Sequence, residues 1–133
     1  MAPAASFTTQ VTPASTRFFT VSPCRIYDSR LAGLPFAAGE VRRLTLAGLC
    51  GLSPTTRAVA INVTAVGVSG GGSLSVAPGG TAGAAAGGPN WKNGQTRAAS
   101  AIVGVDTAGA VDVSCQAVSG ATHLVIDVAG YFE

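Results

Sequence analysis

HLVIDVAGYF, at residues 123–132, is a run in which apolar side chains alternate with other residues. Leu124, Ile126 and Val128 share one side of an extended chain, which is the period of two expected of a strand packed on a core. Asp127 stands among apolar neighbours, so we expect its carboxylate to have a partner elsewhere in the chain. The run predicts a strand within a larger β-structure.

The composition favours an all-β protein. The 133 residues include 18 glycines, and charged residues make up only 11% of the chain, against roughly 25% in typical soluble proteins. Lysine, glutamate and methionine, which favour helices, are scarce, whereas valine, threonine and glycine are plentiful. A chain of this length can bury a single core, so we expect one domain.

Short alternating segments separated by glycine turns predict a single-domain β-sandwich, jelly-roll-like, with seven or eight strands. In the clearest of them, 57–66, Val59, Ile61 and Val63 share one face. We expect the sandwich domain to span residues 17–133, and residues 1–16 to form an N-terminal arm or edge strand. The other predicted strands are 17–21 continuing into 25–28, 40–46, 73–76, 97–105, 111–117 and 123–131.

Charge and hydropathy argue against two classes of partner. The net charge is +2, and Arg42-Arg43 is the only adjacent basic pair. Nucleic-acid binding requires clustered positive charge, commonly with stacking aromatic residues. No segment approaches the ~20 apolar residues of a membrane-spanning helix. We therefore expect no nucleic-acid partner and no membrane span.

Three cysteines, Cys24, Cys50 and Cys115, allow three single disulfide pairings. Cys24 and Cys50 lie at the ends of predicted strands, whereas Cys115 shares a face with two valines and is expected to be a buried thiol. We therefore favour a Cys24–Cys50 disulfide. The alternative is zinc, but the chain has one histidine and no CxxC spacing, so we expect no metal site.

Arginines and aspartates in two distant segments predict structural ion pairs. We expect Asp28 or Asp127 to bind Arg25, Arg30 or Arg97, because a bidentate arginine–carboxylate bond gives directional order to a glycine-rich chain. In a strictly extended strand Arg25 and Asp28 would point to opposite faces. A bend in that strand is therefore needed to bring them together.

The only tryptophan, Trp91, lies in a predicted loop among amide side chains. An aromatic platform flanked by amides is one way in which lectin-like sites hold a sugar ring, so a glycan could contact Asn90, Trp91, Asn93 and Gln95. The competing interpretation, which we favour, is that Trp91 folds back and closes one end of the sandwich.

The sequence gives little support for catalysis. His123 next to a serine or cysteine could form a nucleophile–base pair, but a lone histidine at a strand end is usually a surface or capping residue. The positions of the six carboxylates are better explained by ion pairing and by turns than by the pair of catalytic acids that a glycosidase requires. The glycine-rich stretch 79–88 is followed by Pro89 and not by the helix that a phosphate-binding loop requires. We expect no enzymatic activity and no cofactor.

Five segments taken in order resemble a domain found repeatedly in predicted secreted or surface proteins of soil and environmental bacteria. That domain has a PCRxxDTR segment, a CGxP segment, an NVT strand, a GQTRAN segment and a final DVxGYF. The corresponding segments here are 23–30, 47–54, 58–66, 93–98 and 123–132.

The resemblance implies secretion, supports the Cys24–Cys50 bridge, and supplies no catalytic residue. Members look like accessory modules of exported proteins, without an assigned activity. This chain departs from the pattern in three places: Ser29 replaces the usual threonine, residues 98–100 are Ala-Ala-Ser where Ala-Asn-Asn is common, and Cys115 is additional. The second departure removes polar groups that a binding strand would use.

These observations predict a non-catalytic extracellular or cell-surface module with a structural or interaction role. Its low charge and exposed strand edges favour self-association, through edge pairing or a sheet face, or assembly with other surface proteins. The arm could also add a strand to a neighbour. The alternative function is a carbohydrate-binding module centred on Trp91.

Overall fold

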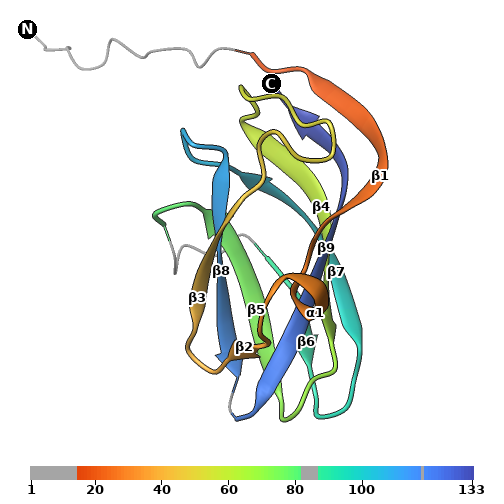
Figure 1. Ribbon diagram of the computed structural model, residues 1–133, viewed down its shortest axis with the longest axis vertical. Coiled ribbons are helices and arrows are strands. Elements are labelled where there is room, and N and C mark those ends of the chain that lie inside the picture. Colours follow the sequence, from red (N-terminus) through yellow and green to blue (C-terminus); the bar gives the residue numbers. More distant parts are fainter. Residues whose placement is uncertain (1–14, 82–86, 118) are drawn as a thin grey trace, which may run out of the picture.

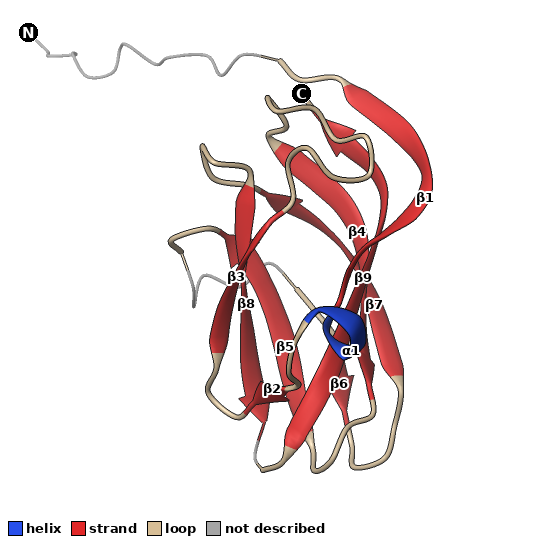
Figure 2. Cartoon of the chain, in the orientation of Figure 1, coloured by secondary structure: helices blue, strands red, loops and turns tan. Residues whose placement is uncertain are grey.

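The computed structural model describes residues 15–81, 87–117 and 119–133, which fold into two antiparallel sheets packed face to face (Figures 1 and 2). One sheet has the strand order β1-β9-β4-β7 and the other β3-β8-β5-β6, with β2 beside β9. The elements are β1 (Phe18–Asp28), α1 (Ser29–Ala32), β2 (Phe36–Ala37), β3 (Val41–Thr45), β4 (Ala58–Val66), β5 (Gly72–Pro78), β6 (Asn90–Trp91), β7 (Arg97–Gly104), β8 (Ala110–Ala117) and β9 (Ala121–Phe132).

This arrangement confirms the predicted all-β sandwich. With β2 set aside, eight strands form two sheets of four, and the chain crosses between the sheets repeatedly, as in a jelly roll. The helix α1 is one turn long, and no helix in the described ranges has the length and apolarity that would carry it across a bilayer. Residues 1–14, most of the predicted arm, lie outside the described residues.

The described residues contain nine strands where the sequence predicts seven or eight. The additional strands, β2 and β6, have two residues each and lie in segments that we predicted to be loops. Two residues are too few to show a period of two, so tertiary pairing alone defines them. In β2, for example, Phe36 pairs with Thr122 of β9.

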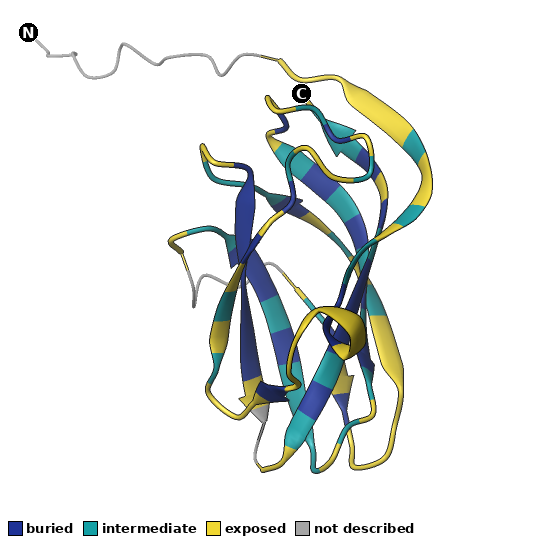
Figure 3. Cartoon of the chain, viewed as in Figure 1, coloured by how far each residue is buried: buried dark blue, intermediate teal, exposed yellow. Residues whose placement is uncertain are grey.

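The strand β9 is the centre of its sheet, because β4 pairs along one side of it and β1 and β2 along the other. Leu124, Ile126 and Val128 are at most 1% exposed, which confirms the predicted inward face. The neighbouring β4 alternates between buried and half-buried residues along its whole length (Figure 3). Across the core lie buried apolar side chains of β3, β5 and β8: Leu44, Leu74, Val76, Val111 and Val113.

The glycine near the end of β9 lets β1 lie close to it. A Cβ at Gly130 would collide with the Phe18 ring and lie 2.8 Å from the Phe19 carbonyl oxygen. Phe18 and Phe19 instead pack against Phe132 and Tyr131, with ring centroids 4.9 and 5.3 Å apart. The start of β1 is thereby joined to the end of β9.

Candidate functional site

Cys24 and Cys50 form the predicted disulfide, with their Cα atoms 5.9 Å apart. Cys24 lies on β1 opposite Val128, and Cys50 lies in the turn after β3. The bond therefore joins β1 to the connection between the two sheets. Cys115 is fully buried in β8, opposite Leu74, as the alternation predicts.

An irregularity in β1 places its charged residues on one face. The pairing with β9 shifts between Arg25 and Tyr27, so Arg25 lies opposite Asp127 and Asp28 opposite Val125. Arg25 Nε donates to Asp127 Oδ1 over 3.0 Å, and Arg25 Nη1 lies 3.9 Å from Asp28 Oδ2. The bend that the sequence required is therefore present, as a β-bulge.

Asp28 binds Arg30 through both of its carboxylate oxygens. Arg30 Nη2 and Nε donate over 2.8 and 2.9 Å, and the Arg30 backbone N–H donates to Asp28 Oδ1 over 3.0 Å. Asp28 thus also caps α1. Arg97, the third predicted arginine, forms no ion pair within the described ranges. It lies opposite Ala65, whose side chain points into the core, whereas Asp127 lies on the outer face.

The Arg30 side chain lowers the pKa of Asp28 from 3.8 to about 2. Because this folded-state pKa lies below the ordinary one, the charged carboxylate stabilises the fold above about pH 4. That contribution is lost as the pH falls from about 4 towards about 2.

We expect Asp28→Asn to lower the melting temperature at pH 7, because asparagine keeps a capping oxygen but lacks the charge that binds Arg30. The difference from the wild type should shrink as the pH approaches 2, where the wild-type carboxyl is also becoming neutral. Circular dichroism melts at pH 7, 4 and 2 measure this, and Arg30→Met should reproduce the loss. A difference that stays constant across the three pH values would contradict the assignment.

His123 contacts a serine, but the geometry is that of a structural bond. Ser29 Oγ lies 2.9 Å from His123 Nδ1 and accepts a hydrogen bond from the Leu124 backbone N–H over 2.9 Å. Ser29 is fully buried, so no substrate can reach its hydroxyl as the chain is folded. The serine fastens α1 to β9.

The predicted glycan platform is not on the surface. Trp91 is 5% exposed and its Nε1 donates to the Gly70 carbonyl over 3.1 Å. Asn93 Oδ1 accepts from the Gly70 N–H, and Gln95 Oε1 from the Lys92 N–H. The indole closes the sandwich because its large apolar surface is better buried. A sugar therefore cannot stack on the indole in this conformation.

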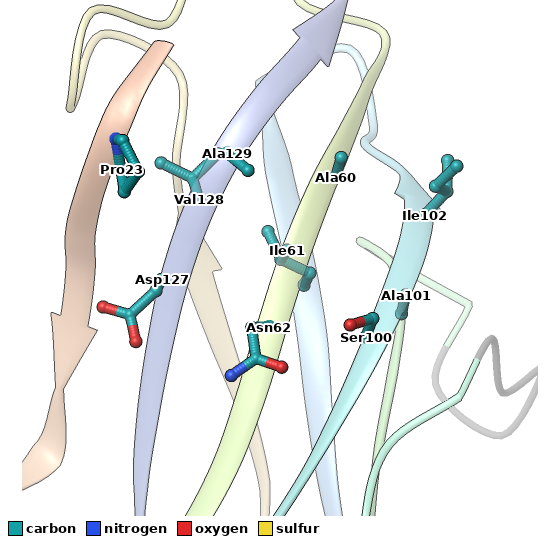
Figure 4. Close-up of a pocket in the computed structure, with 10 residues that line it drawn as sticks. All are labelled: Pro23, Ala60, Ile61, Asn62, Ser100, Ala101, Ile102, Asp127, Val128 and Ala129. Atoms are coloured by element: carbon teal, nitrogen blue, oxygen red, sulfur yellow. The ribbon is translucent and has the colours of Figure 1, made fainter. Parts of the chain in front are cut away.

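The outer face of the β1-β9-β4-β7 sheet carries a shallow hollow of about 470 Å³ (Figure 4). Its walls are mostly small or apolar, and its polar side chains come from neighbouring strands: Asn62 from β4, Ser100 from β7 and Asp127 from β9. Ile102 on β7 is 65% exposed. This surface was not predicted from the sequence, although the alternation in 57–66 already places Ala60 and Asn62 on the face opposite to the core.

A second missed feature is the environment of Arg42. Its guanidinium lies 3.8 Å from the centroid of the Phe36 ring and donates to Tyr27 Oη, to the Leu34 carbonyl and to Glu40. Arg42 shares the inward side of β3 with Leu44, which alternation from Leu44 would have indicated. The cluster joins β1, β2 and β3 at one side of the core.

No protein-family model matches this chain, and no curated protein is similar to it. The resemblance to a module of exported bacterial proteins therefore stays a prediction. In the described ranges, His, Cys, Asp and Glu side chains do not gather in groups of three or more that could hold a metal ion. The function must be inferred from the outer sheet face and the strand edges.

Proposed function

We propose that this chain is a non-catalytic extracellular module that associates with further copies of itself and serves a structural role. The observation that carries the proposal is the outer face of the β1-β9-β4-β7 sheet. There, Ile102 is 65% exposed beside a hollow lined by small and apolar side chains. Contiguous exposed apolar surface with polar groups at its rim is typical of protein–protein contact sites.

The low surface charge supports self-association over binding to a charged partner. Eight basic and six acidic residues are spread over 133 positions. Several of them are neutralised in pairs, among them Arg25–Asp127, Arg42–Glu40 and Arg43–Asp106. A surface with little net charge opposes the approach of a second copy only weakly.

An extracellular location is supported by the Cys24–Cys50 disulfide, because such bonds persist mainly in oxidising compartments. The resemblance to exported bacterial modules points the same way. The disulfide and the ion pairs of β1 suit a module that must stay folded outside the cell.

Light scattering coupled to size exclusion tests the proposal. We expect a defined species with at least twice the 13.0 kDa mass of the chain at micromolar to high-micromolar concentrations. The apparent mass should decrease on dilution, because an association equilibrium depends on concentration. A monomeric mass throughout this range would contradict self-association.

A further inference from the structure

We propose that β7 is the association edge, and that it pairs antiparallel with β7 of a second copy to join two sheets into one. This inference rests on the proposed function, because it specifies how self-association takes place. In the described part of the chain, β4 is the only strand that pairs with β7. Among the described residues, no strand pairs with the other side of β7.

The hydrogen bonds at the end of β7 show which backbone groups face outward. Val105 N–H donates to the Arg57 carbonyl over 2.9 Å, so Val105 and every second residue before it direct their backbone groups towards β4. Ala98, Ser100 and Ile102 are the residues in between. Their N–H and C=O groups point away from β4, which gives a regular row of donors and acceptors.

The β7 edge lacks the features that usually prevent edge pairing. It is eight residues long, pairs with β4 without a register shift, and carries no charged residue or proline after Arg97. Long, regular and uncharged edges are the ones that recruit another strand. Its exposed Ile102 adds apolar surface next to the open row.

The edges formed by β1, β3 and β6 are protected. The β1 edge has two register shifts and contains Pro23. The β3 edge carries Arg42 and Arg43 in ion pairs, and β6 is only two residues long. Bulges, prolines, charges and short length are the devices by which natural sheets block edge pairing. Their presence on three edges sets β7 apart.

The residue pattern of β7 fits a second copy in antiparallel orientation. A two-fold axis beside Ser100 or Ala101 pairs residues whose backbone groups point away from β4 with the same kind of residue in the second copy. The N–H groups of one copy then face the C=O groups of the other. With the axis at Ser100, Ala98 lies beside Ile102 of the second copy, and about six backbone hydrogen bonds form. This orientation also separates the two Arg97 side chains, which a parallel pairing would place together.

Sedimentation velocity on the whole chain tests the edge. The wild type should form a dimer, and Ile102→Lys should halve the mass, because a lysine beside the second copy opposes pairing. Ser100→Pro should do the same, because it removes an outward N–H that β4 does not use. The matched control, Val41→Lys, places the same charge at a half-exposed valine on the β3 edge and should leave the dimer intact.

Amide hydrogen exchange gives an independent measurement of the same edge. In the wild-type dimer the N–H groups of Ser100 and Ile102 should exchange more slowly than in a diluted, monomeric sample. A dimer that survives both β7 substitutions with these amides unprotected would overturn the inference and leave self-association standing. A wild type that remains monomeric would overturn both. If Ser100→Pro does not fold, Ile102→Lys and the exchange data decide.

Discussion

Phe36→Ala is expected to lower the free energy of unfolding by about 3–5 kcal/mol, the usual cost of truncating a fully buried phenylalanine. Phe36 is 0% exposed and forms half of the two-residue β2. Its ring packs in the core and underlies the guanidinium of Arg42. The substitution therefore leaves a cavity and also removes the surface on which a partly buried cation rests.

Urea unfolding followed by tryptophan fluorescence measures this change. Leu34→Ala is the control, because Leu34 lies two residues away and is 76% exposed. We expect it to stay within about 0.5 kcal/mol of the wild type, as substitutions at exposed positions usually do. Equal effects of the two variants would show that β2 does not contribute to the core as described.

Replacing both Cys24 and Cys50 with serine is expected to lower the free energy of unfolding by about 3 kcal/mol in the chain-entropy model. The cysteines are 26 positions apart, so the bond closes a loop of substantial length in the unfolded chain. Its loss also unfastens β1 from the connection that follows β3. Denaturant unfolding with and without a reductant measures the effect.

The double-serine variant provides its own control. Reductant should destabilise the wild type and leave the variant unchanged, because Cys115 has no part in the Cys24–Cys50 bond. Overlapping unfolding curves for the oxidised wild type and the variant would show that the bond does not stabilise the fold. A decrease in the stability of the variant on reduction would show that Cys115 takes part in a reducible bond.

Much of the sandwich could be predicted because strand alternation is local. Leu124, Ile126 and Val128 lie in the core as predicted. The strands that were missed, β2 and β6, are too short to carry a period of two. They exist because Phe36 and Trp91 are placed against the core by segments distant in sequence.

The sequence predicted which charged residues form ion pairs better than it predicted which of them bind each other. Arg25, Arg30, Asp28 and Asp127 form ion pairs, but which arginine binds which aspartate depends on the bulge in β1. Arg97 was wrongly included, because its position in β7 puts it on the other side of the sheet from Asp127.

The sequence alone determined the all-β class, the inward faces of the long strands and the cysteines that pair. Each of these follows from residue type and short-range spacing, which are local properties of the sequence. The tertiary structure alone decided that β9 is central, that Trp91 is buried, and that β7 is the last strand in the order of its sheet. A strand becomes an edge only when no other segment pairs with one of its sides. Local periodicity does not indicate which strands will be neighbours, because that depends on segments distant in sequence.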